Sequence, residues 1–419
     1  MIAEAVAELV VPERSKTFAS LKYPGAGRYF LGLALSMLGS WMQSIALSWL
    51  VIHELHGKGA MLAIVGIFQF GPTLVLGAWA GSLADRFDKR RMMFVTQAAL
   101  GLCALGLAAM DFSNRESLAA VLALAGVAGF ATAFDTPVRR SIIGDLVPPE
   151  VVPNAMSLNT GVITSSRVAG MALGGFVTKW AGTSWCFLAN GVSYLAMIVA
   201  LVGLAQRTHE ARRPTTDRRV RDAIVHVWRT PALRIAMGAT TIIATLTFNY
   251  QLTFPLLIKD VFNGEADRLG TLFAVTSIGS FTGAMISARR RTPTVEVFLL
   301  GGLLMGVGAV GAATASTLLV CELWTVPMGV GGGLLMAQLS GMLTSLSDPS
   351  MRGRVLALQS VVFLGSTPIG GPVIGLVADH AGARWAMAVG GLAALAATFL
   401  AGIALVVQRR SGLRVALRP

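Results

Sequence analysis

The stretch from Gly59 to Arg91, GAMLAIVGIFQFGPTLVLGAWAGSLADRFDKRR, joins a long apolar run to a charged loop. Its first 26 residues, 59 to 84, carry no charge. A helix of about 17 to 25 such residues spans the hydrocarbon core of a bilayer. Six of the next seven residues are charged. The stretch therefore predicts one transmembrane helix that ends at a membrane surface.

The same alternation of apolar run and short polar loop recurs along all 419 residues. Twelve runs are long enough to cross the membrane: 29–52, 59–84, 92–110, 118–134, 151–178, 180–206, 235–258, 269–288, 297–314, 323–346, 355–378 and 385–407. Backbone polar groups in lipid must be satisfied within the segment, and the spacing does not suit alternating barrel strands. We predict an all-α integral membrane protein with twelve transmembrane helices.

The composition agrees with lipid as the main solvent. Hydrophobic residues make up 54% of the chain and charged residues 13%, against roughly 25% charged in soluble domains. The mean hydropathy is +0.68. The 47 glycines are expected to permit close helix contacts, as small residues do in membrane bundles. A soluble globular protein and a disordered chain are both excluded.

Basic residues are distributed unequally between the two sides. Of the 34 Lys and Arg, 27 lie in the N-terminal segment, in the loops after even-numbered runs and in the C-terminal tail, whereas six lie in the other loops. Cytoplasmic loops retain the excess of Lys and Arg, so both termini are expected in the cytoplasm. The net charge of +13 is then a topology signal, and no nucleic-acid partner is expected.

The longest hydrophilic stretch divides the chain into two halves of six runs. The expected divisions are a cytoplasmic segment 1–28, a six-helix bundle 29–206, a cytoplasmic linker 207–234, a second bundle 235–408 and a tail 409–419. An internal repeat at an offset of 200 supports two related halves. It pairs Pro149, Leu158, Val162, Gly170, Gly175, Val177, Gly182, Trp185, Gly191 and Leu195 with Pro349, Leu358, Val362, Gly370, Gly375, Val377, Gly382, Trp385, Gly391 and Leu395. Parallel repeats with a midplane site between them are a transporter architecture.

The loop after the second run carries a recognisable motif. Gly81, Asp85, Arg86 and Arg90 have the spacing of a G-x-x-x-D-R-x-G-R/K-R motif. The loop thereby resembles the signature of the major facilitator superfamily. Asp88 stands where the family has glycine. The resemblance implies two pseudo-symmetric six-helix bundles and a role for this motif in switching between conformations. Gly81 would allow close helix contact, and Asp85 would contact a helix N-terminus or an arginine across the halves.

Three further stretches resemble one branch of that superfamily, the enterobactin exporter and related drug-efflux proteins. They are Gly39 to Ser44, Phe134 to Arg139 with Asn154 to Asn159, and Arg352 to Val355. This resemblance implies a multi-pass protein of a bacterial cytoplasmic (inner) membrane. It leaves the substrate open.

Uncharged polar residues are dense on particular runs and are expected to face a central cavity. With Arg167, the only charge in its run, the predicted substrate-cavity residues are Gln43, Gln69, Asn159, Arg167, Asn249, Tyr250, Gln338 and Gln359. A guanidinium at the bilayer centre costs about 2.5 to 3.5 kcal/mol on insertion scales, so Arg167 should face a cavity or a partner. Aromatic and methionine side chains nearby suit a large amphipathic ligand.

Few acidic residues lie where they could carry a proton across the membrane. Glu322, near the start of its run, is the best placed, and Asp135 is the second candidate. A carboxylate in a low-dielectric cavity can hold a proton near neutral pH. Either residue could therefore couple transport to the proton gradient.

The sequence thus predicts a secondary transporter that exports an amphipathic, drug-like or siderophore-like small molecule by alternating access. The export would be driven by proton antiport. It would act as a monomer in the lipid bilayer, without cofactor or metal. No phosphate-binding GxxxxGK[ST] loop occurs to indicate ATP hydrolysis. An importer or uniporter of the same fold remains open, as does a non-transporting receptor. A membrane-embedded enzyme would need a nucleophile or metal motif within the runs, and none is present.

Overall fold

A computed structural model describes residues 18–84, 87–202, 220–290, 292–348 and 351–410. The N-terminal half contains α2 (Ala26–His53), α3 (Gly59–Ala84), α4 (Lys89–Phe112), α5 (Leu118–Leu146), α6 (Val152–Ala181) and α7 (Thr183–Val202). The C-terminal half contains α8 (Val220–Arg229), α9 (Pro231–Leu246), α10 (Tyr250–Leu256), a π-helical turn (Leu257–Val261), α11 (Ala266–Ala288), α12 (Val295–Thr314), α13 (Leu318–Ser345), α14 (Arg352–Ala381) and α15 (Ala383–Arg410). Two short 3₁₀ turns, Ala19–Lys22 and Pro149–Val151, complete the described helices.

The structure confirms the all-α membrane fold. Eleven helical segments of the described chain are long and apolar enough to cross a membrane. The expected crossing at 151–178 corresponds to α6, which has 30 residues but is not among those eleven. Its polar side chains, including Asn159, Ser166 and Arg167, lower its hydropathy. A helix that is too polar to face lipid all round is expected to turn its polar side towards the protein interior.

The crossing expected at 235–258 is broken in the structure. α9 ends at Leu246, Asn249 adopts φ −96° and ψ 38°, and α10 begins at Tyr250. Asn249 donates its side-chain amide to the carbonyl of Thr245 over 2.7 Å, and Thr247 donates its hydroxyl to the carbonyl of Gly390 over 2.7 Å. The first bond satisfies a carbonyl at the end of α9, as irregular backbone at membrane depth requires, and the second connects the break to α15.

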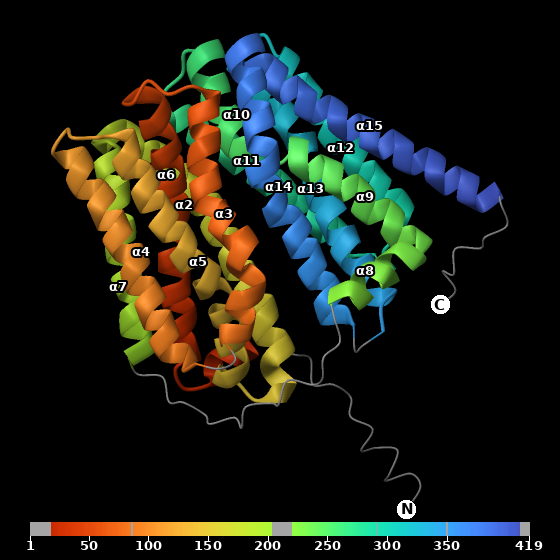
Figure 1. The fold of residues 1–419 in the computed structure, drawn as a ribbon, viewed down its shortest axis with the longest axis horizontal. Helices are drawn as coiled ribbons and strands as arrows, with labels where there is room; N and C mark the ends of the chain where they lie inside the picture. The colour runs from red at the N-terminus through yellow and green to blue at the C-terminus, as the bar shows by residue number, and fades with distance from the viewer. Residues whose placement is uncertain (1–17, 85–86, 203–219, 291, 349–350, 411–419) are drawn as a thin grey trace, which may run out of the picture.

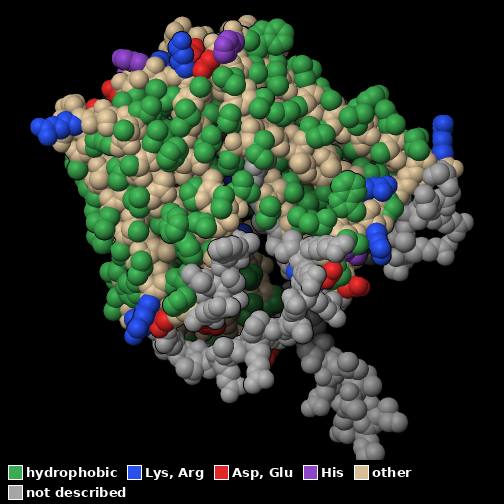
Figure 2. Space-filling model, viewed as in Figure 1, with side chains coloured by type: hydrophobic (Ala, Val, Ile, Leu, Met, Phe, Trp, Pro, Cys, Tyr) green, Lys and Arg blue, Asp and Glu red, His purple; other side chains and the backbone are tan. Residues whose placement is uncertain are grey.

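The two halves form separate groups of helices that lean together at one end (Figure 1). We call this the closed end; it is where α2 ends and α3 begins. Here α3 packs on α14 and α6 packs on α11. Towards the other end the groups diverge, and Figure 2 shows a hollow between them in the lower part of the molecule. Apolar side chains cover most of the sides of the molecule in the same view, as expected of a surface in contact with lipid.

Glycines allow the close contacts at the closed end. A Cβ at Gly175 of α6 would lie 2.5 Å from the carbonyl oxygen of Ala266 and 2.6 Å from the Cα of Gly270 on α11. A Cβ at Gly375 of α14 would lie 2.7 Å from the carbonyl oxygen of Gly59 on α3. Gly175 and Gly375 are partners in the internal repeat, so the two halves use the same position to approach each other.

Candidate substrate cavity

A cavity of about 270 Å³ lies between the halves, next to the closed end. Its wall is formed by parts of α2, α3 and α6 from one half and by parts of the α9–α10 junction, α10, α11 and α14 from the other. Ser44 and Ser48 of α2 and Gln251 of α10 both line the cavity and connect the halves. Gln251 donates its side-chain amide to the hydroxyl of Ser44 over 3.0 Å, and its backbone carbonyl accepts from Ser48 over 3.5 Å. The cavity therefore depends on both halves.

Four of the eight predicted cavity residues line this space: Gln69, Arg167, Asn249 and Tyr250. The break between α9 and α10 places Asn249 and Tyr250 at the wall. Discontinuous helices form the substrate sites of many transporters.

The other four predicted residues are not part of the described wall. Gln43 accepts from the amide of Asn190 on α7 over 2.7 Å. Gln338 accepts from the backbone of Thr294 and donates to Ser287, each over 2.8 Å. Gln359 exchanges hydrogen bonds with Ser340 of α13, and Asn159 is buried within α6. The first three hold neighbouring helices together.

Aromatic side chains supply much of the apolar surface of the cavity. Phe248 contacts Tyr250 and Phe363 with ring centroids 5.6 and 5.1 Å apart. Tyr250 stacks on Phe254, with centroids 5.3 Å apart and planes inclined by 12°. On the opposite half, Trp41 of α2 faces the cavity. The wall thus combines aromatic faces with a few amides and hydroxyls, a common composition of sites for small organic molecules.

Arg167 of α6 is the one charged residue in the described wall of the cavity. Its guanidinium carbon lies 6.0 Å from the centre of the Trp41 ring, within the range of a cation–π contact. Its Nε is buried and has no hydrogen-bond partner among the described residues. The prediction that Arg167 would face a cavity or a partner agrees with this placement.

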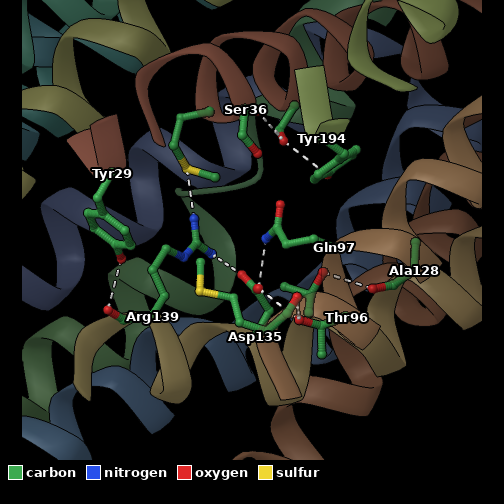
Figure 3. Close-up of polar contacts among 12 residues, drawn as sticks. Tyr29, Ser36, Thr96, Gln97, Ala128, Asp135, Arg139 and Tyr194 are labelled. Atoms are coloured by element: carbon green, nitrogen blue, oxygen red, sulfur yellow. Dashed lines mark hydrogen bonds and ion pairs between the residues drawn. The ribbon is translucent and has the colours of Figure 1, made fainter. Parts of the chain in front are cut away.

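Asp135 lies in a buried polar cluster inside the N-terminal half (Figure 3). It does not belong to the described cavity wall. Its carboxylate forms an ion pair with Arg139 one turn along α5 over 2.7 Å. It also accepts from Thr96 over 3.0 Å and from Gln97 over 2.8 Å, both on α4. These three donors allow the ionised carboxylate to exist in the interior, where an unpaired charge would be strongly disfavoured.

The same cluster connects α5 with α2, which lines the cavity. Arg139 contacts the sulfur of Met37 over 3.1 Å, and the hydroxyl of Tyr29 donates to the backbone carbonyl of Arg139 over 3.1 Å. Figure 3 shows the Arg139 side chain between the Asp135 carboxylate and the Tyr29 ring. A change of charge at Asp135 would therefore alter contacts of the helix that carries Trp41, Ser44 and Ser48.

Glu322, the other proton-coupling candidate, has a simpler environment. It lies in the second turn of α13 and accepts from the hydroxyl of Thr271 on α11 over 2.9 Å. Its side chain is partly exposed, and it does not belong to the described cavity wall.

The switch motif is described only in part. Asp85 and Arg86 lie outside the described residues, and Gly81 falls in the last turn of α3. Arg90 donates to the backbone carbonyl of Val202 at the end of α7. Asp88 caps α4 by accepting from the backbone N–H groups of Arg90 and Arg91 over 2.9 and 3.0 Å. Its φ of −61° is accessible to any residue, so this position does not require the family's glycine.

Two charged residues that sequence reasoning did not select connect the halves at the closed end. Asp379 of α14 accepts from the backbone N–H groups of Gly59 and Ala60 over 2.6 and 3.1 Å, and so caps α3. Lys179 of α6 contacts Glu265 and Asp267 at the start of α11 over 3.1 and 3.0 Å.

Asp379 and Lys179 stand 200 positions apart, the offset of the internal repeat. Asp379 of α14 binds the N-terminal end of α3, and Lys179 of α6 binds the N-terminal end of α11. A search of the internal repeat for corresponding charged positions, in addition to identical residues, would have selected both.

Comparison with known proteins decides the family. A model of the transmembrane secretion effector family, MFS_3, matches residues 16–412. The chain belongs to the major facilitator superfamily of transporters. This assignment excludes the enzyme alternative.

Relatives with named activities are distant but span most of the transporter. The staphyloferrin A transporter of Staphylococcus aureus is 23% identical over 287 residues, covering 68% of this chain and 72% of that protein. The multidrug efflux pump Tap of Mycobacterium tuberculosis is 23% identical over 362 residues, covering 83% and 85%. The lysophospholipid transporter LplT of Serratia proteamaculans is 26% identical over 302 residues, covering 69% and 72%.

Solved structures share the fold. A bacterial homologue of the human lysosomal transporter Spinster, crystallised inward-facing and unoccupied, superposes with a TM-score of 0.70 at 17% identity. It covers 94% of this chain and 99% of that one. The D-xylose–proton symporter superposes with a TM-score of 0.71 at 12% identity, covering 90% and 97%.

Proposed function

We propose that this transporter exports an amphipathic small molecule across a bacterial cytoplasmic membrane by alternating access, in exchange for protons. The observation that carries the proposal is the cavity between the halves, which adjoins a closed end held by contacts between those halves. The mixed aromatic and polar wall fits a molecule with an apolar body and polar groups. The named relatives, a siderophore transporter and a multidrug efflux pump among them, support export of such molecules.

The proposed orientation places both termini in the cytoplasm, so that the closed end faces outwards. The support is the excess of basic residues on the opposite side of the membrane. In this orientation the diverging ends of the two halves face the cytoplasm, and the conformation is one that receives substrate from inside. A monomer suffices for this cycle, because one chain supplies both walls of the cavity.

Cysteine labelling tests the orientation. In a chain whose Cys103, Cys186 and Cys321 have been replaced, single cysteines at exposed Lys58 and Arg115 should react with an impermeant maleimide added to intact cells. A cysteine at exposed Arg229 of α8 should react only after the cells are permeabilised. The reverse pattern would show that the termini lie outside.

We propose that Asp135 carries the proton. Protonation removes the negative charge that holds Arg139, so the buried ion pair is lost and the arginine must find other acceptors. The contact of the Arg139 guanidinium with Met37 passes this change to α2. Burial and direct connection to a cavity helix favour Asp135 over Glu322, whose one described side-chain hydrogen bond joins α13 to α11.

The motif of Gly81, Asp85, Arg86 and Arg90 is proposed as the switch at the opposite end. In this proposal Asp85 forms a contact between the halves when the cytoplasmic side closes. Asp85→Asn should then leave insertion intact and slow turnover by shifting the balance between states.

The experiment that tests export uses intact bacteria with and without the transporter, loaded with a panel of amphipathic dyes, antibiotics and siderophores. We expect at least one compound to leave faster from cells that contain it. A protonophore should abolish this difference while cellular ATP is maintained. Faster entry instead would identify an importer, and efflux that survives the protonophore would contradict proton coupling.

A further inference from the structure

The described cavity wall has an unbalanced charge. Its lining residues include Arg167 but no Asp or Glu. A wall of this kind repels cationic molecules and attracts anions. The charge is present in one half only, because the position of the internal repeat that corresponds to Arg167 is Thr367. Helix packing that both repeats share therefore does not explain why an arginine stands at position 167.

Two hydrogen-bond donors at the wall lack a partner among the described residues. They are the Nε–H of Arg167 on α6 and the hydroxyl of Tyr250 on α10, and both atoms are buried. The two side chains line the same cavity, one from each half. Arginine can only donate hydrogen bonds. An acceptor-rich anion between the two residues would satisfy both donors and neutralise the charge.

Hydrogen bonds to a charged group are stronger than neutral ones, and guanidinium binds carboxylate and phosphate through paired N–H groups. Next to this position lie the faces of Trp41 and Phe248, which would accommodate an apolar body. The charged and apolar parts of a ligand would thus have separate places on the wall.

We propose that the substrate is an organic anion: an amphipath whose carboxylate, phosphate or sulfonate binds Arg167 and Tyr250 while its apolar body lies on the aromatic wall. The inference rests on the proposed export function and defines its substrate class. Because Arg167 belongs to one half and Tyr250 to the other, the anion would bridge the halves.

Direct binding measurements test this class without any transport step. The probes are 1-anilinonaphthalene-8-sulfonate and N-phenyl-1-naphthylamine, which share one aromatic skeleton and differ by the sulfonate. Each is titrated calorimetrically into the full-length protein in lipid nanodiscs, and the signal of empty nanodiscs is subtracted. We expect the sulfonate to bind roughly 10- to 100-fold more tightly, the range of a charge-assisted hydrogen bond.

Three variants assign the preference to the two side chains. Arg167→Ala should abolish it, Arg167→Lys should retain part of it because the charge stays but the planar fork is lost, and Tyr250→Phe should weaken only the sulfonate. Arg115→Ala is the matched control, since it removes an exposed arginine that does not belong to the described cavity wall. It should bind both probes as the unmodified protein does.

Competition then compares the possible head groups. Decanoate or decyl phosphate should displace the bound sulfonate, and decylamine should not. Equal affinity for the two probes, equal displacement by decylamine, or an unchanged preference in both Arg167→Lys and Tyr250→Phe would overturn the proposal. Selective anion binding by a protein that expels nothing from cells would instead refute export alone.

Discussion

Asp135→Asn is expected to abolish proton-driven accumulation while exchange of substrate for substrate continues. Asparagine has the same shape and can still accept from Thr96 and Gln97, so the local packing is retained. It cannot ionise, so the protein can no longer alternate between a charged and a neutral state. Exchange requires only the reorientation of the loaded transporter and should persist.

A stability measurement accompanies this prediction. The variant leaves Arg139 largely buried without its counter-ion, and breaking a buried pair in this way costs about 3–5 kcal/mol. The double variant Asp135→Asn with Arg139→Gln removes both charges and should recover most of this loss in thermal unfolding. Transport by the double variant should still lack proton coupling.

Glu322→Gln is the matched comparison for coupling. We expect it to keep concentrating substrate, because Glu322 lies outside the described cavity wall and outside the Asp135 cluster. Coupling lost in Glu322→Gln but kept in Asp135→Asn would assign the proton to Glu322.

Gly175→Val is expected to hold the closed end open. The new Cβ would lie 2.5 to 2.7 Å from backbone atoms of Ala266 and Gly270, and a backbone cannot turn aside as a flexible side chain can. Overpacking of this kind costs about 1–3 kcal/mol, which shifts the balance between the two conformations roughly 5- to 150-fold. Net transport should fall accordingly, since the transporter seldom returns to the state shown here.

Labelling measures the shift directly. Ser48 lines the cavity and contacts Gln251. A cysteine at this position should react slowly with an external impermeant maleimide in the otherwise unmodified chain. It should react rapidly in the chain that also carries Gly175→Val. Gly161→Val is the control on the same helix, because nothing lies within 4 Å of a Cβ at that position. Equal labelling rates in all three proteins would mean that this glycine contact does not control access.

The membrane helices and the placement of Arg167 towards the protein interior could both be predicted from the sequence, for the same physical reason. Lipid tolerates neither unpaired backbone groups nor a charge without a partner, so long uncharged runs had to be helices and a charge within such a run had to face the protein interior. The all-α membrane class follows from constraints of this strength, whereas the family was predicted from the resemblance of particular motifs, such as the one from Gly81 to Arg90.

The uncharged polar residues were harder to place. Gln69 faces the cavity whereas Gln43 contacts Asn190. The sequence does not distinguish these two glutamines, because a membrane helix is apolar on most faces and its pattern does not show which face turns inwards. The rotation of such a helix is set by its packing partners. The break at Asn249 was missed for a related reason, since the run continues in hydropathy across it. The spacing of Asp135 and Arg139, four residues apart on one helix, did contain a usable signal for an ion pair.

The most direct test of the account measures proton movement caused by substrate. The purified transporter is reconstituted into liposomes that hold a pH-sensitive dye, with an imposed pH gradient and the membrane potential clamped by potassium and valinomycin. Addition of a compound that cells expel should make protons cross in the direction opposite to the substrate, and this flux should be absent with Asp135→Asn. Substrate movement with no accompanying proton flux in the unmodified protein would contradict proton-coupled export.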